Sequence, residues 1–167
     1  CASPRKGDNT DLMADAFGRG AEAAGAEVEK VYLDDLWIRP VAHLADDPSM
    51  RVDLRADDDM PRLLERLAAV DVVLFASPVF WAGVAAQLKA FMDRWSCYTG
   101  QAWFKDAMPR KVYAVVTAHG SPMPEMGEFV IGPLRDTALY LGGRYAGEVA
   151  FVGAKYGAVA QHPEVLA

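Results

Sequence analysis

Short, continuously apolar stretches alternate with longer amphipathic ones along this chain. Residues 72–76 and 112–116 are apolar throughout, which is typical of strands that are covered on both faces in a parallel sheet. Residues 28–33 form a more polar run, as expected of an edge strand, and residues 149–152 form another short apolar run. The pattern predicts a strand in each of these places.

Between these runs, apolar residues recur at spacings of three and four, which places them on one face of a helix. Four such stripes are Leu12, Met13, Ala16, Phe17 and Ala24; Met60, Leu63, Leu64 and Leu67; Leu88, Phe91, Met92 and Trp95; and Leu134, Ala138 and Leu141. We expect Asn9 or Thr10 to cap the first helix and Gly25 to follow its end. Pro133 is expected to start or kink the last helix.

Strands that alternate with helices predict an α/β fold with a parallel sheet, whose ligand lies at the carboxyl ends of the strands. The chain opens on a loop with only two residues ahead of it, and residues 163–166 resemble the start of a helix. We therefore expect the given sequence to lack a first strand and most of a last helix. Residues 40–58 are polar and irregular and are expected to form a solvated loop, with an acidic docking surface as the alternative.

Composition limits the class of protein. The 167 residues suit a single domain, 1–167, and 52% hydrophobic with 24% charged residues is a globular composition. No apolar run approaches the roughly 18 residues that cross a bilayer, and a net charge of −6 disfavours nucleic acid as a partner. Cys1 and Cys97 are too few for a disulfide scaffold and lack the spacing of a zinc or iron–sulfur site. A cytoplasmic location is the default expectation.

The loop before the first helix has the composition of an anion site. Residues 3–10 read Ser-Pro-Arg-Lys-Gly-Asp-Asn-Thr, so hydroxyls, an amide, a cation and the N–H groups of a helix N-terminus can all face one anion. The spacing permits a single phosphate to be surrounded. Ordinary capped turns use the same residue types, and they are the alternative interpretation.

Two further loops follow the buried strands. Residues 77–83 contain Phe80 and Trp81, which gain little in a solvated loop unless they cover something flat and apolar; capping of the core or a subunit contact is the alternative. Residues 117–122 contain His119, which can donate to a carbonyl oxygen or can be an ordinary hydrogen-bonded loop residue. Because the carboxyl ends of parallel strands meet at one edge of the sheet, the three loops are expected to lie together.

These segments resemble those of the NADPH-dependent FMN reductase family of flavodoxin-like proteins. Residues 3–10 resemble the family's phosphate loop, and residues 77–84 with 87–94 resemble its flavin-ring loop and the helix that follows. The resemblance extends over nearly the whole chain and implies a flavodoxin-like three-layer sandwich with strand order 2-1-3-4-5. It also implies that the first loop holds the FMN phosphate, that the second lies against the isoalloxazine ring, and that the third passes beside it.

The resemblance implies which residues bind the cofactor. They lie in the three loops: Ser3, Arg5, Lys6, Asn9 and Thr10; Pro78, Val79, Phe80, Trp81 and Gly83; and Thr117, His119 and Gly120. The flavin carries the chemistry, so no side chain is predicted to be catalytic and no metal is predicted. NADPH or NADH is the expected electron donor, and a flavin, a quinone or a similar small molecule is the expected acceptor.

A homodimer or homotetramer is expected. Trp103 and Phe104 fit neither a strand nor a helix pattern, and an exposed aromatic pair indicates an interface. The resemblance supports this expectation, because relatives often complete the flavin site with a neighbouring subunit.

Two departures and two alternatives bear on this interpretation. Ala2 stands where the family usually has glycine, and residues 39–43 contain no cysteine, whereas some relatives hold an iron–sulfur centre there. The main alternative is a flavodoxin-type electron-transfer module without its own substrate, although such carriers are more acidic and use a threonine-rich phosphate loop. A low-molecular-weight tyrosine phosphatase is disfavoured, because three residues separate Cys1 from Arg5, too few for both to wrap a phosphoryl group.

Overall fold

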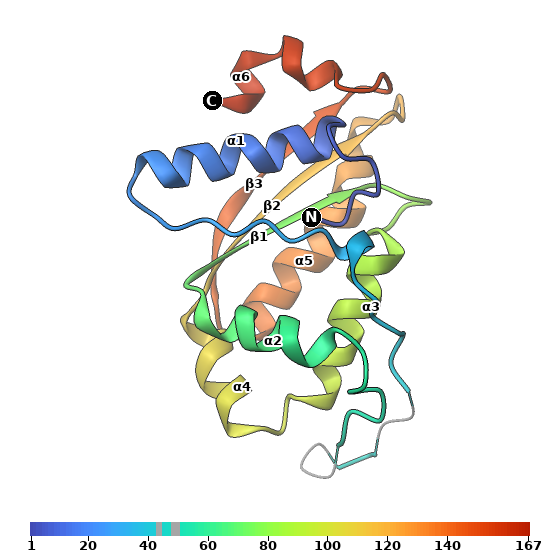
Figure 1. Cartoon of the computed structure of the whole chain (residues 1–167). Helices are drawn as coiled ribbons and strands as arrows, with labels where there is room; N and C mark the ends of the chain where they lie inside the picture. Colours follow the sequence, from blue (N-terminus) through green and yellow to red (C-terminus); the bar gives the residue numbers. More distant parts are fainter. Residues whose placement is uncertain (43–44, 48–50) are drawn as a thin grey trace.

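The chain forms a three-layer α/β sandwich, as predicted (Figure 1). The computed structural model describes residues 1–42, 45–47 and 51–167, so parts of the predicted loop at 40–58, and the last residue of the 39–43 segment, lie outside the described residues.

The sheet is parallel. Its strands are β1 (Val72–Pro78), β2 (Val112–His119) and β3 (Arg144–Val152), hydrogen-bonded in the order β1-β2-β3. The three strands predicted at these places are confirmed, and each is longer than its apolar run. The register joins Pro78 to Ala118, so β1 and β2 end side by side.

Helices cover both faces of the sheet. α1 (Asn9–Ala23) and α6 (Pro163–Leu166), with the 3-10 turn η6 (Ala158–Gln161), lie on one face, and α3 (Ala86–Arg94) and α5 (Glu128–Tyr140) lie on the other (Figure 1). Within the described residues, the remaining elements are α2 (Met60–Ala69), α4 (Ala102–Ala107), η1 (Leu33–Asp35), η3 (Trp95–Cys97), η4 (Met108–Arg110) and η5 (Pro124–Gly127). Among the described residues, no helix is both long and apolar enough to cross a membrane.

The helices follow the predicted stripes, with corrections at two boundaries. In α2, Met60, Leu63, Leu64 and Leu67 are all buried, as their spacing predicts. The N-cap of α1 is Asp8, whose carboxylate accepts the Asn9 N–H, and not Asn9 or Thr10. α5 begins at Glu128 with Pro133 inside it, so the expectation that Pro133 starts this helix is wrong, and the alternative that it kinks the helix stays a prediction. Gly25 follows the end of α1 with φ 89°, as expected.

The predicted strand at residues 28–33 is not assigned as a strand. Its backbone nevertheless pairs with the start of the chain, because Cys1 N donates to Val31 O at 2.6 Å and Leu33 N donates to Cys1 O at 2.9 Å. On the other side, Ala2 N donates to Ala76 O of β1 at 2.7 Å. Residues 1 and 2 therefore lie between this segment and β1, and the full strand order 2-1-3-4-5 stays a prediction.

The aromatic pair at Trp103 and Phe104 is helical, contrary to expectation, and the pair is not jointly exposed. Both residues belong to α4, a helix of only six residues. Phe104 is buried, with its ring 6.2 Å from that of Trp95, whereas Trp103 is 37% exposed. Phe104 is thus part of the core, and the pair gives little support to a subunit contact.

The acidic segment before α2 is partly buried, which corrects the expectation of a wholly solvated loop. Arg94, at the end of α3, is fully buried and forms ion pairs with Asp53, at 2.5 Å, and with Asp58. The Tyr98 hydroxyl also donates to Asp53 at 2.5 Å. Burial disfavours the charged form of Asp58, but the Arg94 guanidinium and two backbone N–H groups outweigh it and hold the pKa of Asp58 below its usual value.

Candidate functional site

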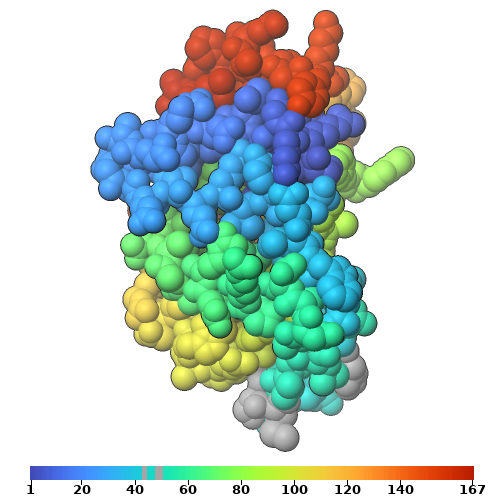
Figure 2. All heavy atoms as spheres, viewed as in Figure 1, coloured from blue at the N-terminus to red at the C-terminus, as the bar shows by residue number. Residues whose placement is uncertain are grey.

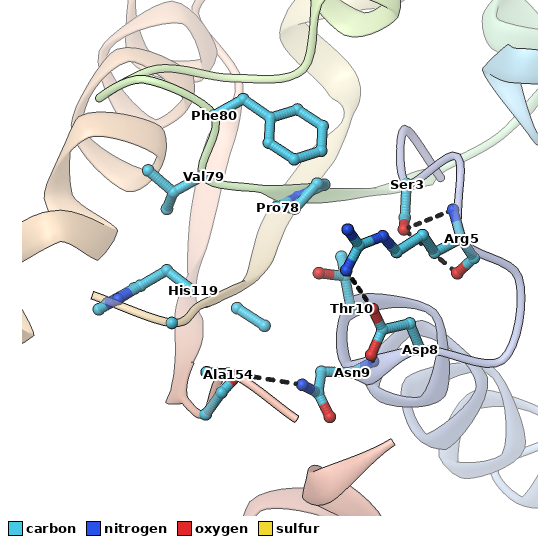
Figure 3. Close-up of a pocket in the computed structure, with 13 residues that line it drawn as sticks. Ser3, Arg5, Asp8, Asn9, Thr10, Pro78, Val79, Phe80, His119 and Ala154 are labelled. Carbon is cyan, nitrogen blue, oxygen red and sulfur yellow. Dashed lines mark hydrogen bonds and ion pairs between the residues drawn. The ribbon is translucent and has the colours of Figure 1, made fainter. Parts of the chain in front are cut away.

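A pocket lies where the predicted loops meet, between the N-terminus of α1 and the carboxyl ends of β1 and β2 (Figure 3). Its lining residues come from all three predicted loops and from the segment after β3. They are Ser3, Arg5, Asp8, Asn9, Thr10, Pro78, Val79, Phe80, Ala118, His119, Gly120, Gly153 and Ala154. The enclosed volume is about 170 Å³, below the roughly 300–1,000 Å³ of a pocket that encloses a drug-sized ligand. A larger ligand would therefore extend beyond the enclosed part.

The first loop is held in shape by its own polar groups. Ser3 is buried, and its Oγ accepts Arg5 N–H at 3.2 Å and donates to Arg5 O at 3.3 Å. Gly7 has φ 79°, and a Cβ there would lie 2.9 Å from the Tyr156 hydroxyl. This turn therefore requires glycine.

Arg5 and Asp8 stand together at the polar end of the pocket. The Arg5 guanidinium lies beside Thr10 in Figure 3, and its Nη1 is 3.6 Å from Asp8 Oδ2. Asp8 Oδ1 accepts Asn9 N–H at 2.8 Å and Gly157 N–H at 3.0 Å. The Thr10 hydroxyl has no hydrogen-bond partner in the described part of the chain.

Asn9 and Lys6 have other partners. The Asn9 amide donates to Gly153 O at 3.2 Å and to Lys155 O at 3.0 Å, and its Oδ1 accepts Val159 N–H at 2.9 Å. Asn9 thus joins the first turn of α1 to the segment after β3. Lys6 does not line the pocket.

Lys6 lies on the outer side of the first loop. Its ammonium is 2.6 Å from Asp35 Oδ2 and 4.5 Å from the centre of the Tyr32 ring. The hydrogen bond from Lys6 to Asp35 raises the pKa of the lysine.

The buried carboxylate of Asp11 supports the first loop. Asp11 Oδ2 accepts Gly7 N–H at 2.7 Å, and Asp11 Oδ1 is 2.5 Å from the Lys30 ammonium. The Tyr32 hydroxyl donates to the same carboxylate at 3.3 Å. Burial would raise the pKa of Asp11, but these donors outweigh burial and lower it. Asp11 is therefore ionised when it fixes the glycine turn.

The second loop carries the apolar end of the pocket. Pro78, Val79 and Phe80 line it, with Phe80 42% exposed. Val79 N donates to Ala118 O at 3.2 Å, which ties this loop to the end of β2. Gly83 closes the loop, because its carbonyl accepts Phe80 N–H at 2.9 Å. Gly83 does not line the pocket.

Trp81 lies outside the pocket. Its side chain is fully exposed and does not line the pocket, and the yellow-green atoms of this loop project from one side of the molecule in Figure 2. Trp81 and Ala82 have φ values of 50° and 55°, a two-residue left-handed turn that normally uses Asn and Gly. Strain of this kind clusters at functional sites.

The third loop brings buried polar atoms without partners to the site. His119 is 6% exposed, and neither of its ring nitrogens has a hydrogen-bond partner among the described residues. Its ring lies on the far side of the pocket from Arg5 (Figure 3). Thr117 is fully buried and outside the pocket, and its hydroxyl also lacks a partner there. Buried groups of this kind are normally satisfied by a ligand or by water.

Sequence reasoning missed four lining residues, Asp8, Ala118, Gly153 and Ala154. Gly153 directly follows β3, so the rule that placed the other loops at the carboxyl ends of strands would have found it. The segment after β3 lies close to the third loop, since a Cβ on Gly120 would lie 2.9 Å from the Cβ of Ala154. Among the described residues, no group of three or more His, Cys, Asp and Glu side chains could hold a metal ion.

Known proteins match this chain in sequence and in structure. A family model for NADPH-dependent FMN reductase matches residues 1–156. An iron–sulfur flavoprotein of Methanosarcina thermophila is 32% identical over 121 residues, which cover 71% of this chain and 60% of that protein. An NAD(P)H dehydrogenase (quinone) of Paracoccus denitrificans (strain Pd 1222) is 30% identical over 114 residues, which cover 68% of this chain and 50% of that protein.

A solved structure agrees along nearly the whole chain. The Trp repressor binding protein from Bacillus subtilis superposes with a TM-score of 0.74 and 25% sequence identity, over 99% of this chain and 91% of that one. The chain spans about half the length of the curated relatives that it matches.

Proposed function

Because the chain belongs to the NADPH-dependent FMN reductase family, we propose that it is an FMN-dependent oxidoreductase that takes electrons from NADPH or NADH and reduces a flavin, a quinone or a similar small acceptor. The observation that carries this proposal is the meeting of three loops at one pocket, with a polar end at Arg5 and an apolar end at Phe80. FMN has the same two ends, a phosphate and a flat ring system.

The residues of the pocket suit this cofactor. Ser3, Arg5 and Thr10 offer the hydroxyl and guanidinium donors that favour a phosphate. Pro78, Val79 and Phe80 offer apolar surface for a ring. A polar ring edge near His119 would give its buried nitrogens the partners that they lack within the described chain.

The predicted site residues then divide into two groups. Those that line the pocket would contact the cofactor: Ser3, Arg5, Asn9, Thr10, Pro78, Val79, Phe80, His119 and Gly120. Lys6, Gly83 and Thr117 would shape the three loops, and Trp81 would cover the exposed side of the ring.

FMN, when bound, supplies the hydride and electron transfer chemistry. The chain's own residues bind its phosphate, orient the ring and keep water from its covered side. We propose that no side chain has to move a proton in this chemistry.

We also propose that the protein works in the cytoplasm as a homodimer or homotetramer whose other partner is the small acceptor, and not a nucleic acid or a membrane. Exposed apolar side chains at the loop edge of the sheet support a contact with a second copy: Phe80, Trp81, Met123 and Phe129. Light scattering at micromolar concentration should give a dimer or a tetramer, and a monomer would contradict this part of the proposal.

The test of the function is spectroscopic and kinetic. The purified protein should bind added FMN with a change in flavin absorbance, and it should oxidise NADPH or NADH in the steady state with a free quinone or free FMN as acceptor. A flavodoxin-type carrier would bind FMN but show almost no such turnover. A protein that binds no flavin would refute the proposal.

A further inference from the structure

We infer that Tyr156, which lies outside the pocket, is a positioning residue for the first loop, because it holds the peptide group between Lys6 and Gly7 in one orientation. This inference rests on the proposed function and concerns the loop that would bind the phosphate of FMN. Tyr156 belongs to the segment after β3 and is 63% exposed, yet its hydroxyl donates to Lys6 O. The two residues are 150 positions apart in the sequence, and Figure 1 shows the segments that carry them side by side at the N-terminus of α1.

Both polar atoms of this peptide group are bound by side chains. The Lys6 carbonyl and the Gly7 N–H belong to one planar unit. Tyr156 donates to the carbonyl, and Asp11 Oδ2 accepts the N–H at 2.7 Å. Because the unit is planar, it cannot rotate without breaking at least one of these hydrogen bonds. The peptide group is therefore clamped at both ends.

The clamp selects a conformation that the backbone does not select by itself. Gly7 has φ 79°, and glycine populates positive and negative φ about equally. The turn therefore depends on contacts with other parts of the chain. A Cβ on Gly7 would lie 2.9 Å from the Tyr156 hydroxyl, so this hydroxyl also fills the space that a side chain at Gly7 would need.

Tyr156 is itself fixed by its two neighbours in the sequence. Gly157 N donates to Asp8 Oδ1 at 3.0 Å, and the Asn9 amide donates to Lys155 O at 3.0 Å. The backbone on either side of Tyr156 is thus bonded to the N-cap and the first residue of α1. Since its ring is mostly exposed, Tyr156 acts on the loop through its hydroxyl and not through burial.

A loop with a fixed peptide group is ordered before its ligand arrives. Arg5 precedes this peptide group and Asp8, the N-cap of α1, follows it, so the clamp holds a cation and a helix N-terminus in a fixed relation. An anion bound there avoids the entropic cost of ordering the loop. Riboflavin has the same ring and ribityl chain as FMN but no phosphate, so it should gain little from the clamp. The consequence is that Tyr156 favours FMN over riboflavin.

The experiment compares Tyr156→Phe with Tyr140→Phe and measures the dissociation constants of FMN and riboflavin by quenching of flavin fluorescence. Tyr140 lies on α5, is 84% exposed, and its hydroxyl has no hydrogen-bond partner in the described chain, so Tyr140→Phe removes the same group without breaking a contact. We expect Tyr156→Phe to weaken FMN binding about fivefold, equal to about 1 kcal/mol, the net contribution of a neutral hydrogen bond. Riboflavin binding should change less than twofold, and Tyr140→Phe should change neither.

A second measurement needs no flavin. Exchange of the Gly7 N–H in the apo protein requires the peptide group to rotate, so Tyr156→Phe should speed its hydrogen exchange about fivefold by NMR, and Tyr140→Phe should leave it unchanged. An unchanged ratio of FMN to riboflavin affinity, or unchanged Gly7 exchange, in Tyr156→Phe would overturn the inference alone. Absence of binding of either flavin to the wild-type protein would overturn the proposed function, and the role of Tyr156 in FMN binding with it.

Discussion

The three aromatic residues around the second loop should differ sharply in what their removal does to folding. Phe75 lies inside β1, is 5% exposed and has its ring 6.0 Å from that of Tyr113. Removal of a core phenylalanine costs about 3–5 kcal/mol of unfolding free energy, so Phe75→Ala should fall in that range. Phe80 is 42% exposed, so Phe80→Ala should cost about half as much, roughly 1.5–2.5 kcal/mol.

Replacement of Trp81, in contrast to that of Phe75, should cost almost no folding stability. Its side chain is fully exposed, so Trp81→Ala should change the unfolding free energy by less than about 0.5 kcal/mol. Its φ of 50° is left-handed, which costs a residue with a side chain about 1–2 kcal/mol. Trp81→Gly removes that strain and costs chain entropy, so it should stabilise the apo protein by about 0.5–1 kcal/mol.

The assay is urea unfolding of the apo proteins, followed by FMN titration of each variant. Phe80→Ala and Trp81→Ala should weaken FMN binding or change flavin fluorescence, whereas Phe75→Ala should do so only in proportion to the unfolded fraction. The assignment of Phe80 and Trp81 to the ring site fails if both variants lose stability on the scale of Phe75→Ala while FMN binding per folded molecule stays the same.

Three further predictions concern the charged residues. Arg5→Ala should weaken FMN binding by about 1.5–3 kcal/mol and riboflavin binding much less; equal losses in a fluorescence titration would contradict the phosphate assignment. Asp11→Asn should weaken FMN binding, because it loosens the Gly7 turn. Asp15→Asn also removes an ion pair with Lys30 and should leave FMN binding unchanged. Equal losses of FMN affinity in the two variants would mean that the lost contact with Lys30, and not the Gly7 turn, weakens binding. The pKa of Asp58 is lowered in the folded state from its usual 3.8, so its contribution is present above that pH and is lost as the pH falls below it. Acid unfolding followed by circular dichroism should show this loss, and Asp58→Asn should reduce the pH dependence while lowering stability at neutral pH; an unchanged acid transition would count against it.

The sequence predicted the elements whose burial follows a local period. The stripe in α2 and the apolar run in β2 are examples, because each fixes its own buried face without knowledge of a partner. α4 was missed because its six residues make fewer than two turns, too few for a period to be visible. The burial of Phe104 depends on Trp95, which lies on another element.

The position of the site could be predicted from the sequence, but which of its hydrogen-bond donors are free to bind a ligand could not. The rule that ligands lie at the carboxyl ends of parallel strands identified the three loops from strand positions alone. Whether Asn9 or Lys6 is free depends on Val159, Lys155 and Asp35, which lie far along the chain. No local pattern contains that information.

α3 joins the buried ion pairs to the second loop of the site. At its start, Ser77 Oγ accepts Ala85 N–H at 3.0 Å and donates to Pro78 O at 2.9 Å, which closes the loop onto the helix. At its end, Arg94 is spaced three residues from Phe91 on the buried face, and it binds the acidic segment before α2. A buried charge left without its partner typically costs 3–5 kcal/mol, so this segment is bound to α3 far more firmly than a solvated loop would be. The acidic segment is therefore packed against the end of α3, and the carboxylates of Asp53 and Asp58, which are buried and paired with Arg94, are not available to dock a partner.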